Sequence, residues 1–265
     1  MDLVSAQNKL REISKIALEY RPDPQPVSFG VIPTEFRGYS EATLRLAVHK
    51  KMPNTQYAQD QAAFMKYLGS SICPKILAMG TSSYCMQFLF PVEHNAESLV
   101  VQEQLLAKYV WTHSSVWIFE CLSFRQDALS WQEALKSKIN IEVPEWAMEE
   151  ISVIHGDPTL DNVLMTADGF LRITDPIPPQ WLGKPSIKGV DHGKLLQSFL
   201  GWEVVLRGME PIRYEWPLFM QHGSLARRAI FWAMVAVKRI AYRDMSDSIT
   251  QWANKVAKEL EQCVY

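Results

Sequence analysis

The sequence has few of the glycine and cysteine patterns by which enzymes and metal proteins are often identified. Its 265 residues include 12 glycines, but no Gly-x-Gly-x-x-Gly or Walker-type phosphate loop. The four cysteines lie far apart, with no Cys-x-x-Cys and no paired histidines. This pattern predicts unpaired thiols and argues against a disulfide framework or a zinc site. The His-Glu-x-x-His and Gly-x-Ser-x-Gly motifs of metalloproteases and serine hydrolases are missing too.

Long apolar runs and a strong charge imbalance are also missing. The longest apolar stretch, residues 229–237, is about half the length of a membrane span. The first residues show neither the basic start nor the apolar core of a signal peptide. A net charge of -2 argues against general binding to nucleic acid or membranes. We therefore expect a soluble, cytoplasmic protein with neither as a partner.

The composition is that of a folded protein. Apolar residues make up 48% of the chain and charged residues only 21%, which is outside the range of disordered sequences. The length is sufficient for one large domain or for two smaller lobes.

One segment carries a specific chemical pattern. Two short apolar runs, residues 163–165 and 170–173, flank Ala-Asp-Gly and predict a β-hairpin with a glycine-containing turn. Asn162 directly precedes the first run, and Asp175 follows the second. Because a hairpin brings its open ends together, we expect these two side chains to be neighbours. Asp157 lies on the loop just before Asn162.

These three side chains fit the transfer of a nucleotide phosphate to a hydroxyl. Asn162 and Asp175 would hold Mg²⁺ through oxygen ligands. Asp157 would orient the attacking hydroxyl and accept its proton. The alternative is a surface loop and hairpin in which Asp and Asn only form turns.

The same segment resembles the signature of the aminoglycoside phosphotransferase-like family of the protein-kinase-like fold. That family has His-Gly-Asp-x-x-x-x-Asn, then two aliphatic residues, a glycine-containing turn and a metal-binding Asp. The matching residues here are His155, Asp157, Asn162 and Asp175. The resemblance implies ATP and Mg²⁺ as cofactors, Asp157 as the catalytic residue, and Asn162 and Asp175 as the metal ligands.

The resemblance also implies an α+β, two-lobed protein-kinase-like fold. Its small N-terminal lobe would be β-rich with one helix, and its larger C-terminal lobe mainly helical. We expect the lobes to cover residues 1–92 and 93–265. Apolar spacing predicts strands in residues 27–31, 34–39, 42–50, 75–79 and 84–90. It predicts helices in residues 3–20, 54–68 (capped by Asn54), 97–111, 192–206, 225–242 and 246–264.

The nucleotide clamp departs from the family pattern. Family members usually have a Lys on the third strand, paired with a Glu of the small-lobe helix, to hold the α- and β-phosphates. The family's Ala-x-Lys pattern would put His49 at the clamp, and Arg45 lies on the same strand face and could serve instead. Lys50 lies on the other face and is a candidate if the strand carries a bulge. A solvated strand end is the alternative for Lys50. Gln61 stands where the Glu is expected, and it would be a weaker partner for a cation.

Other residues are predicted to bind the adenine of the nucleotide or to support the loop that carries Asp157. The backbone around Phe90 and Val92 would meet the adenine edge, although the core of a strand is the alternative for Phe90. His155 would pack and hydrogen-bond under the catalytic loop. Asp191 follows a Gly-x-Pro element similar to the family's, and would support that loop or cap its own helix. Lys194 is expected to be a solvated helix residue.

The acceptor is predicted to be a small molecule that is not a polycation. Three of the four residues after Asp175 are prolines, which argues against the mobile activation loop of a protein kinase. Residues 203–265 contain nine Lys and Arg against seven acids, which favours a sugar-like or other neutral or anionic acceptor. Solvated helix faces are the alternative for these cations.

The sequence thus predicts a kinase, an ATP-dependent phosphotransferase that moves the γ-phosphate to a hydroxyl of a small molecule. The alternatives are a protein Ser/Thr kinase and a nucleotide-binding pseudokinase or scaffold.

Overall fold

The computed structural model describes residues 28–31, 46–89, 104, 106–108, 110–111, 133–149, 152–159, 161–166, 170–184, 186–209, 223–241 and 245–264. The chain divides into two compact units. Unit 1 comprises Met1–Val92 and Met165–Thr174, and unit 2 comprises Glu93–Leu164 and Asp175–Tyr265.

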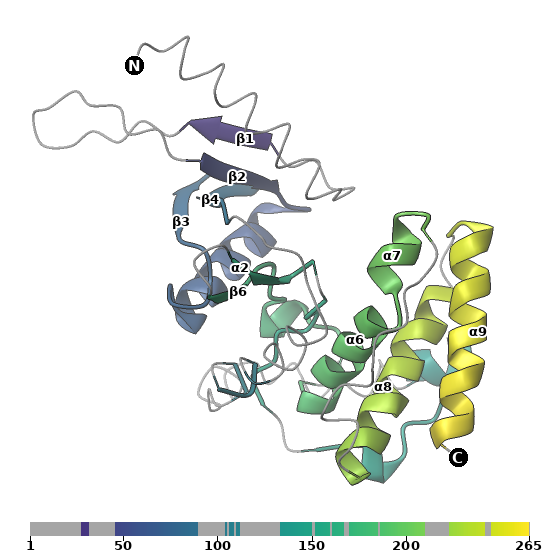
Figure 1. Cartoon of the computed structure of the whole chain (residues 1–265). Helices are drawn as coiled ribbons and strands as arrows, with labels where there is room; N and C mark the ends of the chain where they lie inside the picture. Colours follow the sequence, from purple (N-terminus) through teal and green to yellow (C-terminus); the bar gives the residue numbers. More distant parts are fainter. Residues whose placement is uncertain are drawn as a thin grey trace, which may run out of the picture. The chain divides into compact units, whose positions relative to one another are not determined.

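Unit 1 is built on a four-stranded antiparallel sheet (Figure 1). In spatial order its strands are β1 (Ser28–Val31), β2 (Leu46–Lys51), β4 (Ser83–Gln87) and β3 (Ile76–Met79). Strand β2 is central and pairs with both β1 and β4, so its side chains lie over the middle of the sheet.

Helix α2 (Thr55–Leu68) begins and packs as its sequence predicts. The side chain of Asn54 accepts a hydrogen bond from the Tyr57 backbone N–H at 2.8 Å, which satisfies one unpaired donor of the first turn. Gln61, Phe64 and Leu68 are buried on the inner face of the helix, which contacts β4 and β3. The predicted helix and its N-cap are confirmed.

The predicted hairpin strands are present as β5 (Val163–Met165) and β6 (Leu171–Ile173), which pair as a separate two-stranded sheet. The backbone N–H of Ile173 donates to the Ile72 carbonyl at 2.7 Å, which ties β6 to the segment after α2. The turn residues 167–169 lie outside the described residues.

Unit 2 is mainly helical, and residues 104, 106–108 and 133–139 are helical in addition to the elements named below. The named α-helices are α6 (Lys188–Phe199), α7 (Trp202–Leu206), α8 (Gly223–Ala241) and α9 (Asp247–Val264). The 3₁₀ helices are η1 (Glu145–Ala147) and η2 (Pro179–Trp181). Helix α8 packs against both α6 and α9 (Figure 1). Its central residues, from Ala229 to Val235, are all buried.

Two features of α6 differ from, or extend, the sequence prediction. The single helix expected for residues 192–206 is wrong, because Gly201 takes a left-handed conformation (φ 96°) and separates α6 from α7. Helix α6 also approaches α8 very closely at Gly193. A Cβ atom on Gly193 would lie 2.5 Å from the carbonyl carbon of Trp232, so the two helices can meet there only without a side chain.

Several predicted elements cannot be compared. The expected helix 3–20 and strand 34–39 lie outside the described residues, as does most of the helix 97–111. In the part of the chain that the structure describes, no helix is both long and apolar enough to cross a membrane.

Candidate active site

The loop that carries Asp157 is held by one buried carboxylate, that of Asp191 on α6. The backbone N–H groups of His155 and Gly156 donate to Asp191 Oδ2 and Oδ1, both at 2.8 Å. Trp111 Nε1 donates to Oδ2 at 3.0 Å. Asp191 has no exposed surface, and a carboxylate with three donors can be stable at such a position. Helix α6 begins at Lys188, so Asp191 lies within its first turn and does not cap it.

Gly156 is required at its position in this loop. Its φ of 85° lies in the left-handed region. A Cβ there would lie 2.6 Å from Leu182 Cδ1 and 3.0 Å from Ile177 Cβ. A larger residue would therefore strain the backbone directly before Asp157 and force Leu182 and Ile177 to move.

His155 lies fully buried beneath the loop. Its Nδ1 accepts a hydrogen bond from the Asp157 backbone N–H at 3.3 Å, and its carbonyl accepts from the Ile177 N–H at 2.8 Å. These contacts connect the loop to the segment that follows Asp175. The position is that of a structural support and not of a group exposed to reactants.

Asn162, predicted as a metal ligand, is hydrogen-bonded to Asp157. Its Nδ2 donates to the Asp157 carbonyl at 2.9 Å and lies 3.5 Å from Asp157 Oδ2. Because the amide nitrogen is oriented toward Asp157, Oδ1 is the atom that Asn162 could offer to a cation. An amide oxygen is a ligand that Mg²⁺ accepts.

Asp175 directly follows Thr174, at the start of the second part of unit 2. It is one of two non-glycine described residues with a positive φ, at 56°. Such a backbone conformation costs free energy and is common at functional sites. Asn162 and Asp175 supply oxygen donors only, a set that suits Mg²⁺ and not a softer metal.

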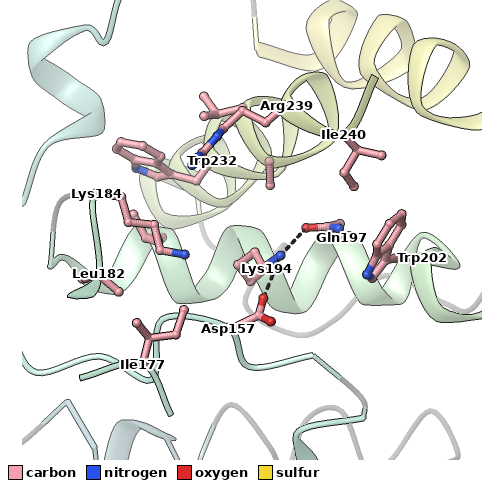
Figure 2. A pocket seen from close by; sticks show the side chains of 13 residues that line it. Asp157, Ile177, Leu182, Lys184, Lys194, Gln197, Trp202, Trp232, Arg239 and Ile240 are labelled. Carbon is pink, nitrogen blue, oxygen red and sulfur yellow. Dashed lines mark hydrogen bonds and ion pairs between the residues drawn. The ribbon is translucent and has the colours of Figure 1, made fainter. Parts of the chain in front are cut away.

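Lys194 contacts the predicted catalytic group directly, so its assignment as a solvated helix residue is wrong. Its Nζ lies 2.8 Å from Asp157 Oδ1 and donates to Gln197 Oε1 at 3.0 Å (Figure 2). Its side chain is only 19% exposed. Burial by itself would raise the pKa of Asp157, but the charges of Lys194 and Lys184 hold that pKa below its ordinary value of 3.8. Asp157 is therefore a carboxylate at neutral pH.

A pocket of about 260 Å³ opens beside Asp157 within unit 2. Helix α6 forms one wall and α8 the opposite wall (Figure 2). Its polar lining consists of Asp157, Lys184, Lys194, Gln197 and Arg239. Its remaining lining is largely apolar and consists of Ile177, Leu182, Val190, Trp202, Trp232, Val235, Ala236 and Ile240.

In unit 1 the structure places two candidates for the phosphate clamp, Lys50 and His49, on opposite faces of β2. Lys50 is 5% exposed and lies directly across from Tyr84 in the β2–β4 pairing, which excludes a solvated strand end. The Tyr84 hydroxyl donates to Gln61 Oε1 at 2.8 Å in the buried layer between sheet and helix. His49 lies on the other face of the strand and is half-buried. Lys50 thus shares the face over which Gln61 lies.

Three predicted site residues cannot be placed. Arg45, Phe90 and Val92 lie outside the described residues.

Lys184 and Gln197 line the pocket beside Asp157, although no sequence pattern predicted a role for either. Lys184 lies in the irregular segment before α6, and its Nζ donates to the Gly156 carbonyl. The only sequence signal for it was its position in the Gly-x-Pro element.

Most of the basic residues that are described in residues 203–265 have structural contacts. Arg207 pairs with Asp161 at 2.5 Å, Arg228 with Glu149 at 3.1 Å, and Lys238 with Glu261 at 2.8 Å. The Arg227 guanidinium lies 4.1 Å from the centre of the Trp146 ring. A simple count of charges in this region therefore overstates its capacity for anions. Among the described Lys and Arg residues of this region, only Arg239 lines the pocket beside Asp157.

Glu203 of α7 provides a stability test of this part of unit 2. It is 2% exposed, and burial raises its pKa to about 7, although the Ser198 hydroxyl donates to it. Because the folded state binds the proton more tightly, stability should fall as pH rises from about 4.5 to 7. Glu203→Gln, which mimics the protonated form, should match wild type at pH 5. At pH 8 it should exceed wild type by on the order of 3 kcal/mol in urea unfolding.

The control for this prediction is Glu259→Gln, at an exposed position of α9. Its effect on stability should be small and should not change between pH 5 and pH 8. An equal benefit of Glu203→Gln at both pH values would contradict the prediction.

Comparisons with known proteins identify solved structures of similar fold. No protein-family model matches the chain, and no curated protein matches it by sequence. The ethanolamine kinase of Plasmodium vivax matches with a TM-score of 0.50 and 10% identity, over 88% of this chain and 81% of the kinase. A proposed fructosamine-3-kinase of Thermobifida fusca has a TM-score of 0.49, with 14% identity over 89% of this chain and 93% of its own. The choline kinase LicA of Streptococcus pneumoniae has a TM-score of 0.47, with 13% identity over 95% of this chain and 99% of the kinase.

The likeness to the ethanolamine kinase concerns the fold alone, since the identity is low. The predicted fold class, an α+β protein-kinase-like fold with a small sheet-containing part and a larger helical part, is confirmed.

Proposed function

We propose that this protein is an ATP-dependent phosphotransferase that moves the γ-phosphate of ATP to a hydroxyl group of a small molecule. The observation that carries the proposal is the position of Asp157. Its carboxylate lies on a loop held by Asp191 and Asn162, and it borders a pocket large enough for a small substrate. The fold is shared with a protein named as a kinase of ethanolamine, which is itself a small hydroxyl compound.

Asp157 would bind the hydroxyl that attacks the phosphate. As a carboxylate it can accept the hydroxyl proton in a hydrogen bond and orient the oxygen toward the γ-phosphate. Lys194 fixes Asp157 Oδ1 and Asn162 approaches Oδ2, so the orientation of the carboxylate is set before any substrate arrives. Fixing the reacting groups in this way supplies much of the catalysis in phosphoryl transfer.

Asn162 and Asp175 would hold the Mg²⁺ of Mg·ATP. When bound, the ion would neutralise charge on the phosphate oxygens. In unit 1, Lys50 is the best-supported phosphate clamp, because it is buried and lies on the face that α2 covers. Gln61 replaces the usual carboxylate partner and is itself hydrogen-bonded to Tyr84.

The segment after Asp175 supports a small-molecule acceptor over a protein substrate. Pro176, Pro178 and Pro179 are all buried, and Ile177 between them bonds to the His155 carbonyl. A segment packed in this way against the catalytic loop is poorly suited to rearrange around a protein substrate.

The nucleotide site can be tested by thermal unfolding with and without Mg·ATP. A ligand that binds only the folded state, at 100 times its dissociation constant, adds about 2.7 kcal/mol to stability. For a chain of this size we expect a rise of several degrees in Tm for wild type. The rise should require Mg²⁺ and should disappear in Asp175→Ala. If millimolar Mg·ATP left the wild-type Tm unchanged, the phosphotransferase proposal would be wrong.

A further inference from the structure

We propose that the acceptor carries a negatively charged group, a phosphate or a carboxylate, which Lys184 and Arg239 bind in the pocket beside Asp157. The proposal rests on the phosphotransferase function proposed above and specifies the class of its acceptor. It narrows the sequence prediction, which allowed neutral acceptors as well, and it concerns the pocket within unit 2 alone.

The charged residues of the pocket lining are mostly cations. Three cations, Lys184, Lys194 and Arg239, face one carboxylate, Asp157. Lys194 is already paired with that carboxylate at 2.8 Å. The lining therefore has a surplus of positive charge in a partly enclosed, low-dielectric space, where an anion would be attracted strongly.

The cations of the pocket repel one another. The pKa of Lys184 is lowered to about 8, mainly by burial and then by the charge of Lys194. The charge of Arg239 acts in the same direction, while those of Asp157 and Asp191 oppose it. Holding Lys184 in its charged form in this pocket therefore costs free energy. A bound anion would repay that cost by direct interaction with the ammonium group.

Helix α6 places a buried hydrogen-bond donor in the pocket lining. Gln197 is 1% exposed, and its Oε1 accepts from Lys194, whose ammonium group can only donate. The amide group is thereby oriented, and its Nε2 has no hydrogen-bond acceptor among the residues that the structure describes. An oxygen of a phosphate or carboxylate in the pocket would satisfy this donor.

The position of Lys184 indicates a compact acceptor. Lys184 Nζ donates to the carbonyl of Gly156, the residue directly before Asp157. A cation that binds the anionic group thus lies beside the carboxylate that would bind the hydroxyl. Trp202 of α7 and Ile240 of α8, with other apolar side chains of the lining, would contact the carbon skeleton (Figure 2). Both polar groups can therefore belong to one small molecule.

Four compounds that differ only in one substituent test this inference. They are glycerol (neutral), glycerate (carboxylate), glycerol phosphate (phosphate) and aminopropanediol (cationic). We expect glycerate and glycerol phosphate, without nucleotide and at constant ionic strength, to raise the Tm in a saturable way. Glycerol and aminopropanediol should have little effect. In both Lys184→Met and Arg239→Met, the apparent affinity for the two anions should fall at least tenfold.

The matched control is Lys255→Met, at an exposed position of α9 outside the pocket, which should keep the wild-type response. Equal shifts with all four compounds, no shift with either anion, or an unchanged response in both pocket variants would overturn the inference. If the anions bound but Mg·ATP did not raise the Tm, the phosphotransferase function on which the inference rests would be wrong. If the phosphate were transferred to glycerol or aminopropanediol as efficiently as to the anions, the proposed acceptor class would be wrong. The proposed phosphotransferase activity would still be supported.

Discussion

Asp157→Asn should lose phosphoryl transfer by a factor of about 10²–10⁴, the usual contribution of a general base. Asparagine keeps the size of the side chain but cannot accept a proton, and it removes the charge that Lys194 contacts at 2.8 Å. The effect should lie in kcat, because Mg·ATP is proposed to contact Asn162 and Asp175 instead. The measurement is the rate of ATP consumption, together with the Mg·ATP-dependent rise in Tm, which should remain.

Asp161→Asn is the matched control for this prediction. Asp161 lies four residues further along the same loop and pairs with Arg207, and its side chain is 46% exposed. Loss of that partly exposed ion pair should cost at most about 1 kcal/mol and should leave turnover close to that of wild type. Equal turnover in wild type and Asp157→Asn would show that Asp157 is not the base.

Asp191→Ala should cause the largest loss of stability of any substitution considered. It leaves three buried donors, the N–H groups of His155 and Gly156 and the Trp111 indole, without their acceptor. Each unsatisfied buried donor costs about 1–3 kcal/mol, so the total should be at least about 3 kcal/mol in urea unfolding. The control is Asp247→Ala, at an exposed position in the first turn of α9, which should lower stability by less than about 1 kcal/mol.

The effect of Asp191 on activity can be separated from its effect on stability with Asp191→Asn. Its amide retains one acceptor oxygen but places an NH₂ group toward a backbone N–H, so the loop should shift without global unfolding. At a temperature where the variant is folded, kcat should fall while Mg·ATP still raises the Tm. A variant as active as wild type would show that the loop does not depend on this carboxylate.

Local sequence patterns were sufficient to predict the parts of the fold that depend on neighbouring residues. Helix α2 was predicted from its apolar spacing and the Asn54 cap, and the hairpin from two short apolar runs around a turn. The break between α6 and α7 had a local signal, Gly201, but the apolar spacing continued across it and concealed the interruption.

The contacts of the pocket could not be predicted in the same way, because they join distant segments. The contact of Lys194 with Asp157 depends on how α6 packs against the loop, which the sequence does not show. From its position on the helix alone, Lys194 was predicted to be solvated. Lys184 lies in irregular structure where no periodicity applies. The alternation of β2 was readable, but only the burial of Lys50 beneath α2 distinguishes it from His49.

The most direct test of the phosphotransferase proposal is the fate of the γ-phosphate. Wild-type protein would be incubated with Mg²⁺, ATP radiolabelled at the γ-position and the four three-carbon compounds, and the products separated. We predict a labelled small molecule other than orthophosphate, formed by wild type and Asp161→Asn but not by Asp157→Asn. Label that stays in ATP, or that is transferred only to protein, would contradict the proposal that this chain phosphorylates a small-molecule hydroxyl.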